Sequence, residues 1–289
     1  MIYYLTHNEI DLDKWDNCIL KSYNSMIYGE SWYLDIVSPE WEALVLGDYE
    51  AVMPLPKKKK YGISFLAQPF LTQQSGIFSE QKIDKKIIKR FIQKIPYWSY
   101  CINMNSENCF EKAMTQPNYV LDLQQSYDKI YLSFSQNTQR NVLKSKKAGI
   151  VIKNDLLPNI FLDFYFSTKK YLESNKNIIS KLITVGFERK KLSLYGAYTI
   201  ENKLVATLCL LHSKNRLIYL LPVSNEEGKK TFAMFVVINE ILCKNAEKSI
   251  ILDFEGSRIE GVARFYRGFG ARLKPYYQIR RLRPKIIFG

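Results

Sequence analysis

Two acidic side chains stand where a short apolar stretch ends near residue 250. The run Ser249–Phe254 reads as a strand, and Asp253 and Glu255 lie two residues apart at its end. Because strand side chains alternate between faces, both carboxylates project to the same side. Paired carboxylates can split their pKa values or hold a cationic amine. The alternative is structural: they cap the next helix or pair with nearby arginines.

The segment that follows, residues 256–272, is rich in arginine. A compact helix is predicted there, with Val262, Phe265 and Tyr266 on one side at helical spacing. The helix and its flanks carry four guanidinium groups, at Arg258, Arg264, Arg267 and Arg272. Guanidinium groups suit phosphate and carboxylate. We therefore predict an anionic ligand, with Arg258, Arg264 and Arg267 among its binding residues, and a solvated helix face as the alternative.

A second cationic segment lies in the middle of the chain. Residues 126–147 are predicted to be helical, to break at Gly149 and to lead into a strand at 150–153. The side chains expected to face inward are Ile130, Tyr131, Val142 and Leu143. The cationic flank predicts that Arg140, Asn141 and Lys144 hold a phosphate-bearing substrate in a groove between two domains. A solvated face is again the alternative.

The sequence offers few residues for histidine catalysis or for metal binding. The only histidines are His7 and His212, and the five cysteines form no CxxC pair or Cys/His ligand set. We expect no metal site and no disulfide framework, which favours a reducing, cytoplasmic compartment. The N-terminus does not read as a signal peptide. The most apolar segments fall far short of the ~20 residues that a spanning helix needs.

Three stretches resemble a known family. The run LDFEGSRIEGVARFYRGFGA, residues 252–271, resembles the D-F-x-G and F-K-x-G-F-G motif of FemABX-type transferases and the A-x-x-F-Y-x-x-x-G-F turn of GNAT acyltransferases. Residues 135–152 resemble the R-x-N-I-x-x-A-x-K-x-G-V segment of FemABX-type proteins. The run PFLTQQSGIF, residues 69–78, is similar to a FemAB-like segment.

The resemblance implies an α/β (α+β) fold of tandem GNAT-like lobes, each a mixed, mostly antiparallel sheet flanked by helices. A length of 289 residues also favours two domains. We place an N-terminal lobe at residues 1–150 and a C-terminal lobe at residues 151–289. The implied activity is an N-acyltransferase that moves an acyl or aminoacyl group to an amine on a small molecule or precursor.

The resemblance also implies roles for single residues. FemABX-type proteins have Lys where this chain has Tyr266, the residue that many CoA-dependent GNAT enzymes use to protonate the departing thiolate. Tyr266, Glu255 and Asp253 are thus the expected catalytic residues, and an acyl-CoA thioester is the expected donor. In GNAT enzymes a glycine-bearing loop before a helix binds pyrophosphate. Here the corresponding residues are Gly228, Lys229, Lys230 and Thr231, without the usual Q/R-x-x-G-x-G/A form.

Two other functions stay open. One is FemABX-type transfer from aminoacyl-tRNA to a cell-wall precursor, and the other is a non-enzymatic binder of RNA or an anionic polymer with a degenerate GNAT site. The net charge of +14 attracts phosphates, nucleic acid or an anionic membrane surface. Peripheral membrane contact is therefore compatible with the sequence, and the sequence does not indicate an oligomeric state.

Simpler patterns predict the remaining elements. Residues 84–94 have helical apolar spacing with a basic outer side. Residues 41–46 and 51–55 read as a hairpin, and Lys57–Lys60 reads as an exposed, solvated loop between prolines and Tyr61. Strands are expected at 192–200, 204–212 and 216–223, followed by a polar loop at 224–231 and a helix at 232–243.

Overall fold

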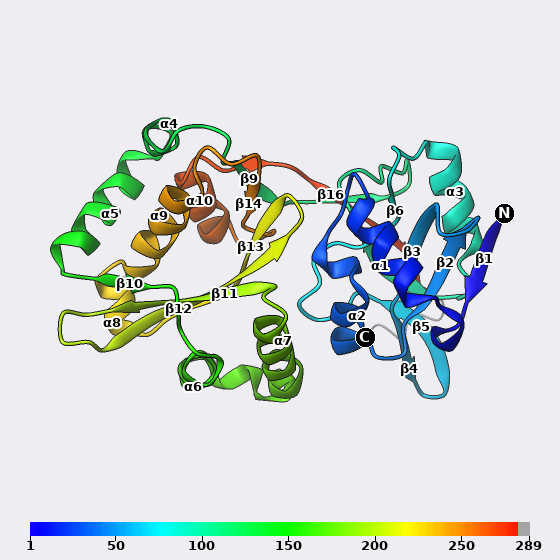
Figure 1. Ribbon diagram of the computed structural model, residues 1–289, viewed down its shortest axis with the longest axis horizontal. Coiled ribbons are helices and arrows are strands. Elements are labelled where there is room, and N and C mark those ends of the chain that lie inside the picture. Colours follow the sequence, from blue (N-terminus) through cyan, green and yellow to red (C-terminus); the bar gives the residue numbers. More distant parts are fainter. Residues whose placement is uncertain (283–289) are drawn as a thin grey trace. The chain divides into compact units, whose positions relative to one another are not determined.

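The computed structural model describes residues 1–282, which fold into two compact units (Figure 1). Among these residues, unit 1 contains 1–117 and 274–282, and unit 2 contains 118–273. Each unit combines mixed or antiparallel sheets with flanking helices, which confirms the predicted fold class. The five cysteines are free.

Unit 1 is built on two sheets. The four-stranded sheet has the order β1 (Ile2–Leu5), β2 (Glu42–Leu46), β3 (Ala51–Leu55) and β6 (Phe78–Ser79). The five-stranded sheet has the order β4 (Lys57–Lys60), β5 (Ile63–Ala67), β7 (Tyr100–Met104), β16 (Tyr276–Arg281) and β8 (Met114–Gln116). The helical segments are η1 (His7–Glu9), α1 (Leu12–Lys21), η2 (Ile27–Gly29), α2 (Ser31–Val37) and α3 (Lys85–Lys94).

Several local predictions for unit 1 are confirmed. Strands β2 and β3 pair antiparallel, as the hairpin pattern predicts. Helix α3 begins after Asp84, whose carboxylate accepts the Ile87 N–H at 2.7 Å and so caps the first turn. Its buried residues, Ile88 and Phe91, join the core under the sheets.

The loop predicted at Lys57–Lys60 is wrong, because these lysines form β4 and pair with β5. A strand at a sheet edge tolerates lysines, since their stems lie along the sheet while their ammonium groups reach water. The connecting residues Tyr61 and Gly62 both have positive φ, 51° and 79°. Such a two-residue turn closes a tight hairpin, and that closure turns the charged segment into a strand.

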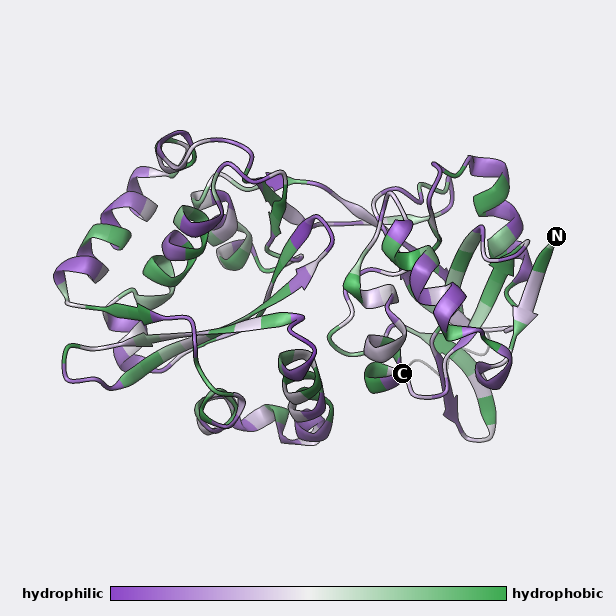
Figure 2. Ribbon diagram, viewed as in Figure 1, coloured by the Kyte–Doolittle hydropathy of each residue, from purple (hydrophilic) through white to green (hydrophobic). Residues whose placement is uncertain are grey.

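Unit 2 is organised around one seven-stranded sheet. Its order is β10 (Val151–Lys153), β11 (Leu192–Tyr198), β12 (Leu204–Ser213), β13 (Arg216–Ser224), β14 (Ile251–Asp253), β9 (Tyr119–Asp122) and β15 (Arg272–Leu273). The helical segments are α4 (Tyr127–Leu132), α5 (Gln136–Lys147), α6 (Pro158–Thr168), η3 (Lys170–Asn175), α7 (Lys176–Glu188), α8 (Glu226–Lys230), α9 (Ala233–Asn245) and α10 (Glu260–Gly268). Figure 2 shows its long strands coloured largely as apolar.

The structure divides the chain elsewhere than at the predicted residue 150. Strand β9 pairs with β14 and β15, so residues 118–150 belong to unit 2. Strand β16 pairs with β7 and β8 of unit 1 and buries Ile279 in its core. Each unit therefore takes in a strand that is distant along the chain, and hydrogen bonding across such separations leaves no local sequence signal.

The helix predicted over residues 126–147 is two helices. Helix α4 ends at Leu132, and Ser135 caps α5 by accepting the Thr138 N–H at 3.2 Å. Serine is a strong cap residue and competes with helix continuation at this point. Ile130 and Val142 are buried as predicted, whereas Leu143 is exposed, because α5 turns that side of its surface to solvent.

Candidate functional site

The sheet of unit 2 opens between β13 and β14. These parallel strands pair over three positions only, from Arg216 with Ile251 to Ile218 with Asp253. Strand β14 ends there, whereas β13 continues to Ser224 along β12. Within residues 1–282, no strand pairs with the β14-facing edge of β13 beyond Ile218. Backbone groups at that edge are therefore placed to bind an extended ligand.

Three non-glycine residues around this opening have left-handed backbones. Leu221 in β13 has φ 52°, Phe232 before α9 has φ 57°, and Glu255 after β14 has φ 60°. The register of β12 and β13 also shifts between Thr207 and Cys209, close to Leu221. Left-handed residues other than glycine carry strain that often marks functional sites. Leu221 in β13 and Glu255 just after β14 place this strain at the two strands between which the sheet opens.

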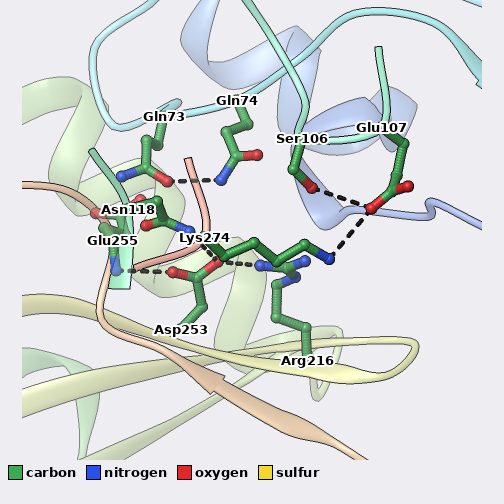
Figure 3. Close-up of polar contacts among 9 residues, drawn as sticks. All are labelled: Gln73, Gln74, Ser106, Glu107, Asn118, Arg216, Asp253, Glu255 and Lys274. Carbon is green, nitrogen blue, oxygen red and sulfur yellow. Dashed lines mark hydrogen bonds and ion pairs between the residues drawn. The ribbon is translucent and has the colours of Figure 1, made fainter. Parts of the chain in front are cut away.

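Asp253 is buried and fully engaged at the end of β14 (Figure 3). Its carboxylate pairs with the Arg216 guanidinium and accepts a hydrogen bond from the Asn118 amide at 3.3 Å. Its other oxygen accepts the Glu255 N–H at 2.8 Å. These bonds tie β13, the start of β9 and the left-handed Glu255 together. Asp253 is thereby placed to position the turn, and the predicted pairing with nearby Arg258 or Arg264 is replaced by Arg216.

Glu255 lies next to this network and is half-buried. Its carbonyl accepts the Tyr119 N–H at 3.3 Å, which fixes its backbone against β9. The Glu255 carboxylate acts electrostatically on Tyr266. Of the two predicted carboxylate residues, Glu255 is therefore the less buried one, and both act electrostatically on the tyrosine.

Tyr266 lies on α10 in a cluster of aromatic rings. Its ring is 5.0 Å from that of Phe254 and 6.0 Å from that of Tyr219, measured between centroids. It is 8% exposed, and among the described residues its hydroxyl has no hydrogen-bond partner. Burial, and then the carboxylates of Glu255 and Asp253, raise its pKa. The phenol thus stays protonated at neutral pH and is available as a hydrogen-bond donor.

A cavity of about 630 Å³ lies beside this cluster, entirely within unit 2. It is bounded by the start of α5, by α10 and by the first turn of α9. The lining residues are Ser135, Asn137, Thr138, Phe235, Gly261, Arg264, Phe265, Arg267 and Gly268. The cavity has the size of a small-molecule site, with an aromatic wall and two arginines.

Glycine allows α10 to approach α5 closely here. A Cβ on Gly268 would lie 2.5 Å from the Thr138 hydroxyl oxygen, and the Gly268 carbonyl accepts the Ser135 N–H at 2.8 Å. Gly270 has φ 83°, and a Cβ there would lie 2.2 Å from the Ser133 hydroxyl oxygen. The predicted glycine turn is thus what brings the two cationic segments together.

The two arginines of the cavity differ in their engagement. Arg267 pairs with Glu260, and it also donates to the Tyr119 hydroxyl at 3.1 Å. Arg264 has no ion-pair partner within residues 1–282. Arg140 reaches the rim by donating to the Asn137 amide oxygen at 2.7 Å. Arg264 is therefore the cation best placed to meet an incoming anion.

The other predicted binding residues are placed less directly. Lys144 lies one turn beyond Arg140, with its ammonium 5.5 Å from the centre of the Phe232 ring, and Asn141 is buried. Arg258 lies between β14 and α10 and does not line the cavity. Helices α5 and α10 both belong to unit 2, so the cavity that they line lies within one unit.

The segment predicted to bind pyrophosphate is the short helix α8 instead of an open loop. The Gly228 N–H donates to the Asn225 side chain at 2.8 Å, and the N–H groups of Lys229 and Thr231 donate to backbone carbonyls. A Cβ on Gly228 would lie 2.2 Å from the Val205 carbonyl oxygen. Gly228 therefore serves close packing against β12. These three N–H groups are already used, and the Lys229 ammonium pairs with Glu226.

Sequence reasoning missed several residues of the site. Arg216 pairs with Asp253 from 37 positions away, and Asn118 does so from 135 positions away. Phe235 and Tyr219 sit inside apolar runs that indicate only core. Only Ser135 and Asn137, at the start of α5, could be recognised in the sequence, since serine and asparagine are typical of a helix cap. In the described part of the chain, His, Cys, Asp and Glu do not gather into a group that could hold a metal ion.

Comparison with known proteins adds evidence on the fold. No family model and no curated protein sequence matches the chain. Among solved structures, FemX is similar with a TM-score of 0.71 and 10% identity, over 99% of each chain. A protein assigned as the C-terminal domain of a lysylphosphatidylglycerol synthetase from Agrobacterium fabrum has a TM-score of 0.59 and 8% identity, over 94% of this chain and 92% of that one.

A third similar structure is a tandem GNAT protein from the clavulanic acid biosynthesis pathway. Its TM-score is 0.50 and its identity 7%, over 97% of this chain and 99% of that one. The chain thus has a FemABX-like, tandem GNAT-type fold, which confirms the resemblance seen in its sequence motifs. At these identities the likeness concerns the fold.

Proposed function

We propose that the protein is a transferase that moves an acyl or aminoacyl group to an amine acceptor, with the reaction centre in unit 2. The observation that carries the proposal is the Tyr266 hydroxyl, protonated and without a partner among the described residues, beside a carboxylate at the opening between β13 and β14. FemX and a tandem GNAT protein share the fold. Their names support this reaction class over a purely structural role.

In this proposal Glu255 takes a proton from the acceptor ammonium, because its carboxylate is partly open to solvent at the end of β14. The uncharged amine then attacks the carbonyl carbon of the donor. Tyr266 donates a hydrogen bond to the oxygen or leaving group that gains negative charge. Asp253 does not exchange protons. It holds the Glu255 backbone through its accepted N–H bond.

The identity of the acyl donor is a more specific part of the proposal. The sequence resemblance favours a thioester, acyl-CoA, because Tyr266 stands where CoA-dependent GNAT enzymes carry their acid. The cavity between α5 and α10 would then take a phosphate group of the donor, with Arg264 as its main contact. Both a CoA and an RNA end carry phosphates, so this contact alone does not select between them.

A second candidate is an aminoacyl ester, as in aminoacyl-tRNA, with a cell-wall precursor or another amine as acceptor. Two observations favour it. The N–H groups of Gly228, Lys229 and Thr231 have internal partners and are not available to a CoA pyrophosphate. The raised pKa of Tyr266 also makes it a weaker acid, which suits a departing alkoxide better than a less basic thiolate.

The test offers the protein each donor separately. Purified full chain is incubated with a panel of acyl-CoAs or with aminoacyl-tRNAs, together with a mixture of primary amines, and products are followed by mass spectrometry. Transfer from either donor supports the reaction class, and the active donor decides between the candidates. If neither donor reacts and neither raises the melting temperature, the proposal fails, because a bound donor stabilises the folded state. RNA binding without transfer would instead favour the non-enzymatic binder.

A further inference from the structure

The hairpin β4–β5 combines cationic and apolar exposure at one end of unit 1. Figure 2 shows β4 in the colour of hydrophilic residues beside the largely apolar β5, and the hairpin projects from the unit (Figure 1). Strand β4 is an edge strand of the five-stranded sheet. Its lysines therefore line a border of the sheet that is open to a partner.

The tip of this hairpin is apolar and exposed. Tyr61, in the two-residue turn, is 79% exposed, and Ile63 at the start of β5 is 46% exposed. Trp98 is also 79% exposed, and it precedes Ser99, whose carbonyl accepts the Leu66 N–H of β5 at 3.1 Å. Tyr61 and Ile63 therefore expose apolar surface at the hairpin tip, and exposed apolar surface next to polar residues is a feature of interaction sites.

Cations flank these apolar residues. Lys58 and Lys59 are exposed and have no ion-pair partner within residues 1–282, and the Lys60 ammonium lies 5.5 Å from the centre of the Tyr61 ring. Lys57 differs, since it is partly buried and pairs with Glu42 at 2.6 Å. The exposed charges of Lys58 and Lys59 complement an anionic surface.

We propose that the β4–β5 hairpin attaches the protein to an anionic lipid membrane, with the lysines at the headgroups and the tip in the interface. Tyr and Trp favour this depth of a bilayer, and lysines are attracted to its anionic lipids. This inference does not rest on the proposed transfer reaction. No helix within the described residues is long and apolar enough to cross a membrane.

Two other partners fit the same surface less well. A second copy that added a strand at β4 would bring two rows of lysines together, and such an edge resists pairing. RNA would match the lysines, but the aliphatic Ile63 gains nothing from a phosphate backbone. A lipid interface accounts for the lysines, the aromatic rings and Ile63 together.

The experiment measures binding of the full chain to vesicles by flotation. Vesicles of pure phosphatidylcholine are compared with an equal mixture of phosphatidylcholine and phosphatidylglycerol. We expect binding to the mixture and little binding to phosphatidylcholine alone. Removing the charges of Lys58, Lys59 and Lys60 together, each changed to Gln, should weaken binding about 100-fold, since each lysine near such a surface contributes about a factor of five.

The matched control removes the same number of charges from α3. Lys85, Lys86 and Lys89 are exposed and lie on a helix of the same unit. Their combined change to Gln lowers the net charge equally, and it should weaken vesicle binding less than about fivefold. Equal losses for both triple variants would show that only the overall charge matters, and the proposal would then be overturned.

Trp98 supplies a direct readout. The other three tryptophans, Trp15, Trp32 and Trp41, are buried, so Trp98 dominates the response of the fluorescence to a surface ligand. Binding should shift the emission to the blue and protect it from a soluble quencher, and Trp98→Phe should remove the shift. A Tyr61→Ser variant, with its fold checked by circular dichroism, should bind more weakly. No vesicle binding by wild type, or RNA binding lost in the β4 variant, would also overturn the proposal.

Discussion

Each unit buries one carboxylate, and the two surroundings differ. Glu42 in unit 1 is 4% exposed, accepts a hydrogen bond from Lys57 at 2.6 Å and is bonded by the Tyr97 hydroxyl. Asp253 in unit 2 is 2% exposed and is bonded by Arg216 and Asn118. Both therefore satisfy the rule that a buried charge needs partners.

The difference lies in the backbone around them. Strand β2, which carries Glu42, is paired on both sides along most of its length, with β1 and β3. Strand β14, which carries Asp253, ends where β13 continues, and the left-handed Glu255 follows. A buried ion pair thus does not itself identify a reaction site. The open edge beside β14, the left-handed Glu255 and the Tyr266 hydroxyl, which is unbonded among the described residues, distinguish the surroundings of Asp253 from those of Glu42.

The largest expected effect tests whether the two carboxylates are equivalent for stability. Asp253→Asn leaves the largely buried Arg216 without its charged partner, which costs about 3 kcal/mol or more, and Glu42→Gln does the same to the more exposed Lys57 at a lower cost. Urea denaturation should show a loss of stability for both. Turnover per folded molecule should fall only for Asp253→Asn, because Asp253 holds Glu255. Equal turnover of the two variants would contradict the role given to Asp253.

The next effect concerns the tyrosine of the site. Tyr266→Phe keeps the ring packing and deletes the hydroxyl, so turnover should fall roughly 10²-fold, the scale of general acid catalysis, with little change in stability. Tyr165→Phe is the matched control, since burial raises the pKa of Tyr165 to about 12 and Tyr165 lies on α6, outside the lining of the cavity. Unchanged turnover for Tyr266→Phe would remove Tyr266 from the mechanism.

Much of the secondary structure could be predicted because its causes are local. The apolar spacing and the Asp84 cap define α3, and alternation with turn residues defines β11 to β13. The sequence pattern did not predict that the lysines of β4 form a strand, or that the helix over residues 126–147 is interrupted at Ser133. In those places sheet-edge pairing and a serine cap outweigh the local pattern.

The site could be predicted only in part. The strand, acidic turn and helix around Asp253, Glu255 and Tyr266 were read correctly as one local unit. The partner of Asp253 and the course of β9 depend on pairing between distant residues, which single-sequence patterns do not encode. The same limit explains why the predicted domain boundary differs from the division seen in the structure.

A smaller effect on donor binding should distinguish two arginines of unit 2. Arg264→Gln should weaken donor binding about tenfold, the scale of one charge-assisted contact, and reduce the salt dependence of that binding. Arg272→Gln is the control, because Arg272 is exposed on β15 and does not line the cavity. Isothermal titration at two salt concentrations measures both. Equal effects of the two variants would indicate a general field instead of a defined contact.

The smallest effect is the alkaline sensitivity of the buried tyrosine. Burial and the two carboxylates raise the pKa of Tyr266 above its unfolded value near 10. Its contribution to stability is then fully present below pH 10 and is lost as the pH rises through the folded pKa. At pH 10 the unfolded phenol is half ionised, so roughly 0.4 kcal/mol is lost relative to pH 8. Tyr266→Phe should lose about that much less in urea titrations.

Tyr97 provides the comparison in unit 1. Burial and Glu42 raise its pKa as well, but its ring is more open to solvent, and screening reduces the effect. At pH 10 the loss is set by ionisation of the unfolded phenol, so Tyr97→Phe should reduce the alkaline loss about as much as Tyr266→Phe does, and it should leave turnover unchanged. An alkaline loss left unchanged by Tyr266→Phe would mean that the phenol of unit 2 is less desolvated than its aromatic cluster implies. An ionised Tyr266 could not donate the hydrogen bond that the proposed reaction requires.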